Sequence, residues 1–444
     1  MNKAENQKSL GIAEMMSYGG VQLSSTIFVA FSAYYLMSFL TDVALIPPAA
    51  TAVLLMFMHL CGALDGLLIG LFINRANFKH GKYRPYYLWL AFPFAISLIL
   101  MGSVPPFGAG VKIAYAAVTL ILCQVCWSVL DMAAWSSLPY LARNDVNRTK
   151  FVSFSNASSI LAFLVVGTFM MPLVELTGGR SRQLGFMLTM TLFAIISVPL
   201  LINAFFRLKE QHNVPQVDKP NLRDIISAIG QNRRIMLFLA GYCVFLMADS
   251  FKNQTTYYYM TINMGRSDLL PVVIMAGIIV SLASQPFIPK LLSFAAKETL
   301  IVAGLFMSSL CSIAMLLAGN NITGLIVCVM LYGAFISVPA NLAFTLMASF
   351  TDEIRLGRNM GISEFLTSGM RISSKVGLAL ASGIAPLTLS LAGYSAQAAQ
   401  QSQTALTGIK ILFIVCTAIG LSLSGIIMLS LKRNTQHKPL HNIN

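Results

Sequence analysis

Several ionisable side chains stand inside long apolar segments of this sequence. At the centre of a lipid bilayer an ionisable side chain costs roughly 2.5 to 3.5 kcal/mol on membrane-insertion scales, so each one needs a partner, a wet cavity or a chemical role. In such surroundings charged groups bind polar solutes, carry protons or neutralise one another. Those expected to bind a solute directly are Asp131, Arg371 and Lys375, and those expected to couple an ion or to form a charge network are His59, Asp65, Asp249, Lys252 and Glu364.

Asp131 and Trp135 are four residues apart, so on a helix a carboxylate and an indole share one face. A carboxylate accepts hydrogen bonds from two hydroxyl groups, and an aromatic ring covers the apolar side of a sugar ring. The pair is therefore typical of a sugar-binding site. Trp135 also lies close to the cytoplasmic end of its predicted helix, so an interfacial anchoring residue is the alternative interpretation.

Glu364, Arg371 and Lys375 follow one another at intervals of seven and four residues, which predicts one polar stripe along a helix. Arg371 and Lys375 repel each other at this spacing. Acidic side chains from other helices, with Asp131 and Asp65 first by depth, are therefore expected to neutralise them. This pattern is compatible with two roles. The charges can take part directly in transport, or they can form a fixed ion-pair network that only holds the helices together.

Asp249 and Lys252 are three residues apart, so they can pair on one helix or help to bind a solute together with Tyr257 and Tyr258. His59 is a candidate proton switch because histidine titrates near physiological pH, and a hydrogen-bonded packing residue is the other interpretation. No His, Asp and Glu cluster or nucleophile triad stands at a membrane surface, so the sequence predicts no metal, no other cofactor and no enzyme.

The elements that carry these residues are predicted to be membrane-spanning helices. The chain has 444 residues, of which 56% are hydrophobic and 10% charged, whereas soluble proteins carry roughly 25% charged residues. This composition excludes a soluble globular protein, and about 20 apolar residues suffice for one helical span. The apolar segments lie near residues 17–40, 49–73, 86–104, 113–135, 152–176, 184–206, 235–261, 269–288, 299–318, 322–347, 363–393 and 407–431.

A polar stretch over residues 207–234 separates six of these segments from the other six. We therefore expect an N-terminal six-helix bundle at 1–206, a central cytoplasmic loop at 207–234, and a C-terminal bundle with a short cytoplasmic tail at 235–444. Two six-helix bundles joined in this way form the fold of the major facilitator superfamily, in which the solute binds between the halves near the membrane midplane. The predicted fold class is an all-α polytopic membrane protein with 12 transmembrane helices.

The positive charges of the chain predict its orientation. The net charge is +14, but Lys and Arg fall in short runs between apolar segments instead of forming one patch, so no nucleic-acid partner is expected. Positively charged short loops stay in the cytoplasm, and both termini lie on the richly basic side. Short loops favour a bacterial inner (plasma) membrane. The basic residues of the opposite side are only Lys112, Arg180, Arg182, Arg266 and Lys410.

Four stretches of the chain carry a resemblance to a known family. Residues 17–19 and 34–43 contain Ser-Tyr-Gly and then Tyr-Tyr-Leu and Thr-Asp-Val, and residues 81–85 read Gly-Lys-Tyr-Arg-Pro. Residues 131–139 contain an Asp, a Trp, a Ser and a Pro at characteristic spacing, and residues 375–402 contain Lys-Val-Gly, Gly-Tyr and Gln-Ser. Over nearly its whole length the chain resembles the glycoside-pentoside-hexuronide:cation symporters, which belong to the major facilitator superfamily.

The resemblance implies a sugar site in which Asp131, Trp135 and Lys375 take part. Two further positions of that site depart from the family's pattern. Thr26 stands where the family has an acidic residue on the first helix, and Asn156 stands where it has an arginine on the fifth. Both are expected to contact the solute, and they allow a different or larger solute than the family's glycosides.

The resemblance also bears on the coupling cation, which the family binds in a cage of acidic residues on its first two helices. Here the corresponding positions hold Thr26, Gly62 and Gly66, Asp65 is displaced by one residue, and His59 stands where the family often has arginine. Sodium prefers several oxygen ligands, and this set supplies one carboxylate at most. A proton is therefore favoured over sodium as the coupling cation.

Together these features predict a secondary active transporter that moves a small polar solute, above all a sugar or glycoside, by alternating access with proton coupling. An uncoupled facilitator or exporter of an amphipathic solute, lipid-like or drug-like, is the alternative, because the 24 Met and 28 Phe residues permit an adaptable apolar cavity. The expected partners are the solute and the lipid bilayer. The resemblance implies a monomer.

Overall fold

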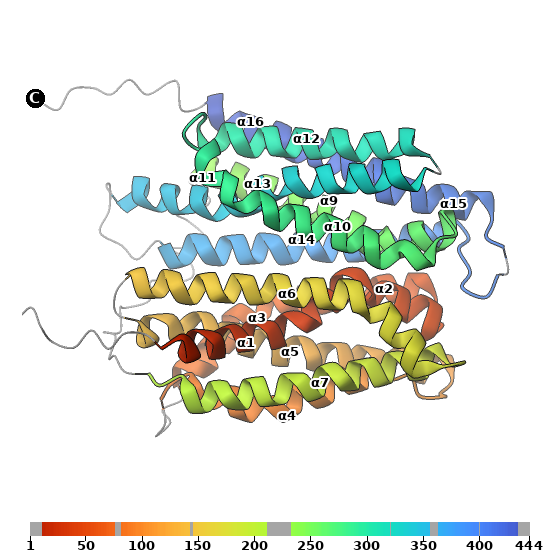
Figure 1. Ribbon diagram of the computed structural model, residues 1–444, viewed down its shortest axis with the longest axis horizontal. Helices are drawn as coiled ribbons and strands as arrows, with labels where there is room; N and C mark the ends of the chain where they lie inside the picture. Colours follow the sequence, from red (N-terminus) through yellow and green to blue (C-terminus); the bar gives the residue numbers. More distant parts are fainter. Residues whose placement is uncertain are drawn as a thin grey trace, which may run out of the picture. The chain divides into compact units, whose positions relative to one another are not determined.

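The computed structural model describes residues 11–75, 81–142, 145–210, 232–319, 321–355, 363–398 and 400–433. Every regular element in these ranges is helical, and none of the described residues lies in a β-strand (Figure 1). The all-α class predicted from the sequence is therefore confirmed.

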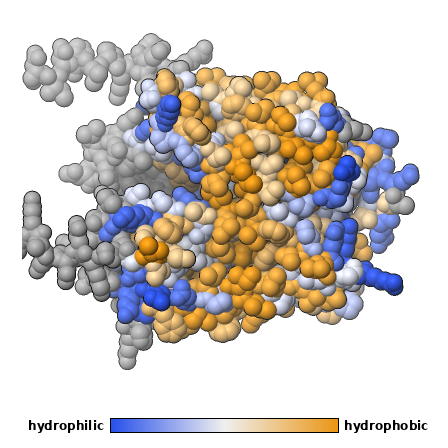
Figure 2. Space-filling model, viewed as in Figure 1, coloured by the Kyte–Doolittle hydropathy of each residue, from blue (hydrophilic) through white to orange (hydrophobic). Residues whose placement is uncertain are grey.

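The described residues contain ten helices that are long and apolar enough to cross a membrane. An eleventh span results if the bent pair Ile12–Tyr34 and Leu36–Val43 counts as one, and Pro48–Ala63 is a shorter apolar segment. That segment continues as helix to Arg75, so the described helices agree approximately with the twelve predicted spans. Figure 2 shows apolar side chains covering most of the visible helix surfaces, with hydrophilic ones near helix ends, as expected for surfaces that face lipid.

The helices divide into two compact units. The first unit comprises residues 1–32 and 64–216, and the second comprises residues 33–63 and 217–444. The chain division predicted above at 1–206, 207–234 and 235–444 stays a prediction, because residues 211–231 of the central loop lie outside the described part. The helices of the first unit are α1 (Ile12–Tyr34, up to Ser32), the end of α3 (Pro48–Arg75), α4 (Arg84–Met101), α5 (Ala109–Leu141), α6 (Asp145–Gly178) and α7 (Arg182–Arg207).

The second unit begins within α1 and contains most of the remaining helices. Its short elements are α2 (Leu36–Ser38), η1 (Phe39–Val43), η2 (Tyr259–Asn263), η3 (Ser267–Leu269), η4 (Gln285–Phe287), α11 (Ile288–Leu291), α15 (Gln403–Lys410) and η5 (Ile411–Cys416). Its long helices are the first part of α3, α9 (Arg233–Tyr258), α10 (Leu270–Ser284), α12 (Lys297–Ala318), α13 (Ile322–Arg355), α14 (Ser363–Leu391) and α16 (Thr417–Arg433).

Polar caps begin several of these helices. The Ser181 hydroxyl accepts a hydrogen bond from the Leu184 N–H at 3.3 Å at the start of α7, and Asn232 accepts one from the Arg234 N–H at 3.1 Å at the start of α9. Such caps satisfy backbone donors that have no partner within the helix. Gly393 follows α14 with a φ of 74°, a left-handed conformation that glycine adopts without strain.

Small residues let the helices of each unit approach closely. In the first unit, a side chain at Gly185 of α7 would meet the backbone of Val174 in α6. In the second unit, Gly377 of α14 lies against the backbone of Cys243 in α9. Apolar side chains gain little from leaving lipid for a helix interface, so close van der Waals contact and interhelical hydrogen bonds hold such helices together. The positions of the charged side chains within each unit follow from this packing.

Candidate functional site: charged and aromatic clusters

Asp131 and Trp135 lie on one face of α5 in the first unit, as their spacing predicts. The Trp135 indole Nε1 donates a hydrogen bond to Asp131 Oδ1 at 3.0 Å. Both side chains are half-buried. Trp127, further back along α5, lies with its ring centroid 6.2 Å from that of Phe28 on α1. The carboxylate therefore has a defined orientation beside an aromatic surface, which suits a solute that has both hydroxyl groups and an apolar face.

Thr26 and Asn156, both in the first unit, differ in burial and in their contacts. Thr26 is only 7% exposed, and its hydroxyl donates to Ser159 Oγ on α6 at 3.2 Å. Asn156 stands one turn before Ser159 on α6 and is exposed. Close packing of α1 on α6 at Gly19, next to Ser158, positions the threonine. Thr26 thus has a structural contact, whereas Asn156 presents its amide on the surface of its helix.

The second unit contains a cluster around Asp249 and Lys252 of α9. The Tyr332 hydroxyl on α13 donates to Asp249 Oδ1 at 2.9 Å, and Asn253 Nδ2 donates to Asp249 Oδ2 at 2.9 Å. The Lys252 ammonium lies 4.4 Å from the centroid of the Tyr332 ring. Tyr34, at the end of α1, lies within electrostatic range of Asp249. We call Asp249, Lys252, Asn253 and Tyr332 the α9 cluster.

Tyr332 modifies the simple pairing of Asp249 with Lys252 that the sequence suggests. The Tyr332 hydroxyl donates a hydrogen bond to the Asp249 carboxylate, and the Lys252 ammonium lies over the Tyr332 ring. One side chain therefore interacts with both charged groups. Tyr332 is 2% exposed and stands 83 residues from Asp249 in sequence. At such a separation no helical spacing indicates that Tyr332 contacts Asp249, and the sequence analysis therefore did not identify Tyr332 as part of this site.

His59 and Lys375 also belong to the second unit. His59 is 8% exposed, and its Nδ1 is buried without a hydrogen-bond partner among the described residues. Lys375 of α14 lies within electrostatic range of it, so a histidine on α3 and a lysine on α14 share one region. Lys375 is half-buried and Arg371 is exposed.

The acidic partners predicted for Arg371 and Lys375 are not tested. The structure describes the helical backbone at Asp65 on α3 and at Glu364 on α14 but not their side chains. Neutralisation of Arg371 and Lys375 by Asp131 and Asp65 stays a prediction.

A second polar cluster, which the sequence did not single out as a site, lies at the far end of α9. Thr41 Oγ1 donates to Asp42 Oδ1 at 2.6 Å and lies 2.6 Å from the Tyr258 hydroxyl. The Tyr394 hydroxyl donates to the same Asp42 oxygen at 2.9 Å. We call Thr41, Asp42, Tyr258 and Tyr394 the Asp42 cluster. It joins two stretches of the family resemblance, residues 34–43 and the Gly-Tyr pair after α14.

The Gly-Lys-Tyr-Arg-Pro loop of the first unit binds a carboxylate of its own chain. Glu210, just beyond α7, accepts hydrogen bonds from three consecutive backbone N–H groups at the start of α4. The donors are Lys82, Tyr83 and Arg84, at 2.7, 2.7 and 2.8 Å. The Arg84 guanidinium lies 4.6 Å from the Phe205 ring centroid, and its Nε donates to the Phe205 carbonyl oxygen. A helix N-terminus favours an anion, so Glu210 ties this loop to the end of α7.

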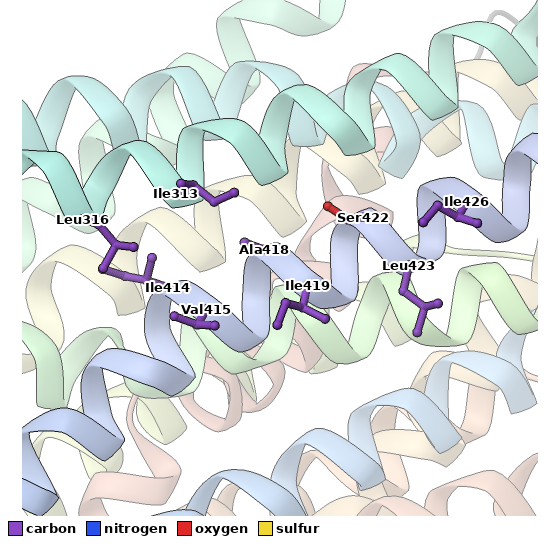
Figure 3. A pocket seen from close by; sticks show the side chains of 9 residues that line it. All are labelled: Ile313, Leu316, Ile414, Val415, Ala418, Ile419, Ser422, Leu423 and Ile426. Atoms are coloured by element: carbon purple, nitrogen blue, oxygen red, sulfur yellow. The ribbon is translucent and has the colours of Figure 1, made fainter.

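An apolar groove of about 400 Å³ runs along the second unit between α12 and α16 (Figure 3). Its one polar lining side chain is Ser422, which shares a hydrogen bond of 2.8 Å with Ser309. This lining contains no charged side chain that could bind a polar solute, whereas a hydrocarbon chain matches its apolar surface. The apolar lining includes Ile313 and Leu316 of α12, and Ile419, Leu423 and Ile426 of α16.

Comparison with known proteins identifies the class. A family model described as "MFS/sugar transport protein" matches residues 17–433, so the chain belongs to this family of the major facilitator superfamily. The chain is a multi-pass membrane protein and a secondary transporter, and the resemblance found in its sequence is confirmed.

Individual relatives agree with this assignment. The chain is 28% identical over 414 residues to the uncharacterized symporter YnaJ of Bacillus subtilis, covering 92% of this chain and 89% of the relative. It is 25% identical over 430 residues to the isoprimeverose transporter of Lactiplantibacillus pentosus, covering 95% and 88%. The solved structure of the nucleoside transporter NupG superposes with a TM-score of 0.67 at 11% identity, covering 96% of this chain and all of that one, which shows the shared fold.

Proposed function

We propose that this transporter carries a sugar or glycoside across the inner membrane, coupled to protons. The observation that carries the proposal is the hydrogen-bonded Asp131–Trp135 pair. A carboxylate that an indole already orients can accept hydrogen bonds from hydroxyl groups of the solute with little further loss of side-chain entropy. The aromatic surface covers the apolar face of a pyranose. The similarity to an isoprimeverose transporter supports a glycoside as the solute.

In this proposal the remaining charges take separate roles. Lys375 and Arg371 neutralise acidic groups during the transport cycle, and Thr26 and Asn156 adjust the size and polarity of the site. The protein works as a monomer with both termini in the cytoplasm. The coupling cation is a proton, because the chain lacks the acidic cage that sodium requires at Thr26, Gly62 and Gly66.

An uncoupled carrier of an amphipathic solute is the second candidate function. The observation in its favour is the apolar groove between α12 and α16, whose lining contains no charged side chain. Such a groove suits an acyl chain. An amphipathic solute would stabilise the protein regardless of pH and sodium, which distinguishes this candidate from the first.

The thermal stability of the purified protein with added solutes tests the proposal. A ligand that binds only the folded state at 100 times its Kd adds about 2.7 kcal/mol of stability. Isoprimeverose and a panel of glycosides and hexuronates should be compared at two pH values, with and without sodium. We expect a glycoside-specific increase in melting temperature that depends on pH but not on sodium. A requirement for sodium contradicts the proposed cation, and an increase with amphipathic solutes alone contradicts the proposed solute class.

The variant Asp131→Asn serves as the control in the same assay. Asparagine keeps an oxygen that can accept the Trp135 indole hydrogen bond but removes the charge. The variant should melt like the wild type without solute and show a clearly smaller increase with the same concentration of glycoside. An unchanged glycoside response in this variant would mean that binding occurs elsewhere.

A further inference from the structure

The α9 cluster differs from a static ion pair in how its two charges are satisfied. Each oxygen of Asp249 accepts a hydrogen bond from a neutral donor, Tyr332 or Asn253. Lys252, which is 8% exposed, donates no hydrogen bond to any residue in the described part of the chain and lies over the Tyr332 ring instead. A lysine that served only as a structural partner would be expected to donate directly to the carboxylate.

This arrangement lets the amine exist in either protonation state. The charged form is stabilised by the π-face of Tyr332 and by the field of Asp249. The neutral form is stabilised because buried surroundings disfavour an ammonium. Asp249 keeps its two neutral donors in both states, so the cluster does not need to rearrange when the lysine loses its proton.

We propose that Lys252 is the residue that binds and releases the coupling proton of this transporter. The ammonium gives one proton to water and becomes a neutral amine. The cluster then changes from no net charge to a net charge of −1. This inference rests on the proposed proton coupling, and it assigns the proton to Lys252 on α9 instead of to His59 on α3, the candidate proton switch of the sequence analysis.

The change of net charge provides a physical reason for coupling. A neutral pair of charges can be closed off from water at a tolerable cost, whereas a single uncompensated charge in an apolar interior is far more costly. The protonated cluster is therefore compatible with an occluded state, and the deprotonated cluster favours a state in which water reaches it. Proton binding and the change of access are linked in this way.

The second unit contains further titratable groups besides Asp249 and Lys252. Tyr332 and Tyr34 remain phenols near neutral pH, and Lys375 and His59 lie within electrostatic range of each other. Asp249 on α9 lies within electrostatic range of Lys252, of Tyr332 on α13 and of Tyr34 on α1. Cys311 on α12 lies within electrostatic range of Tyr332.

The first test needs no solute. The purified full-length wild type, Lys252→Gln and Lys252→Arg are titrated between about pH 6 and pH 9 and the bound protons counted; the wild type should release about one more proton than either variant. Arginine keeps a cation over Tyr332 but does not lose its proton, so it separates loss of titration from loss of charge. Equal proton counts in all three proteins overturn the proposal.

The second test follows transport of isoprimeverose in proteoliposomes. In Lys252→Gln and Lys252→Arg, accumulation driven by a pH gradient should fall at least about tenfold, while counterflow exchange stays within about threefold of the wild type. The exposed Lys290→Gln is the matched control and should keep both activities. Undiminished accumulation in either Lys252 variant overturns the inference. Absence of any isoprimeverose transport in the wild type contradicts the proposed solute, while the proton count still decides the role of Lys252.

Discussion

At the scale of single residues, hydrogen-bond partners limit the orientation of three side chains that the sequence analysis singled out. Asp131 is oriented by an indole, Asp249 by a phenol and an amide, and Thr26 by a serine hydroxyl. Fixed orientation reduces the entropy that solute binding must overcome. Asp131 is therefore the group whose loss should affect binding most directly.

We predict that Asp131→Asn abolishes glycoside uptake without preventing membrane insertion. Hydrogen bonds to a charged group are worth about 1.5 to 3 kcal/mol, so glycoside binding should weaken roughly 10- to 150-fold. Uptake of a labelled glycoside by cells and the amount of protein in the membrane fraction measure the two effects separately. Trp135→Phe, which keeps an aromatic surface but loses the indole donor, should have a smaller effect. Normal uptake by Asp131→Asn would exclude Asp131 from the site.

At the scale of elements, two contacts connect segments that are distant in sequence. Glu210 is 126 residues from Arg84, and Asp42 is 352 residues from Tyr394. The first contact ties the start of α4 to the end of α7 within the first unit. The second ties the end of the first apolar segment to the turn after α14 within the second unit. Each depends on one carboxylate that accepts several hydrogen bonds.

The Glu210 contact predicts a stability effect of moderate size. Glu210→Ala removes the anion from the N-terminus of α4 and should lower the free energy of unfolding by about 1 to 2 kcal/mol. Gly81→Ala should act in the same direction by about 1 kcal/mol, because Gly81 has a φ of 108° and its new Cβ would lie 3.0 Å from the Glu210 carboxylate. Thermal melting measures both. The exposed Glu175→Ala is the control, and a loss of equal size there would show that the contact has no special role.

The Asp42 cluster predicts non-additive effects of mutation. Tyr258→Phe and Tyr394→Phe each remove a hydroxyl from a network that centres on one carboxylate. Side chains in one hydrogen-bonded network usually show coupling energies of about 0.5 to 3 kcal/mol in a double-mutant cycle. We expect the double variant to be less destabilised than the sum of the single variants. Strict additivity in melting experiments would mean that the two tyrosines act independently.

At the scale of the whole molecule, the distribution of positive charge predicts the topology. All seven cysteines lie within helices, so a cysteine introduced near the end of a helix can be labelled selectively against a low background. We expect a membrane-impermeant maleimide to label Lys112→Cys in intact cells and Lys290→Cys only after lysis, because basic loops stay in the cytoplasm. The reverse pattern would invert the proposed orientation, and labelling of both sites in intact cells would contradict the predicted spans between them.

The sequence by itself determined the class of this protein. Hydropathy is a local property, so apolar segments such as residues 184–206 predict helices such as α7 without any knowledge of their neighbours. Contacts within one helical turn are equally local, and the Asp131–Trp135 hydrogen bond follows from a spacing of four residues. The family followed because its short motifs keep their spacing along the chain.

Only the tertiary structure decided which distant side chains meet. Tyr332 contacts Asp249, Glu210 contacts the Arg84 backbone, and Tyr394 contacts Asp42, each from a distant part of the chain. No periodicity within one segment encodes such a pairing. Small residues such as Gly377 let the backbones of two helices approach closely. The physical reason is that packing between helices, which depends on side chains from the whole unit, determines the partners of a buried charge, whereas the local chain determines only that the charge is buried.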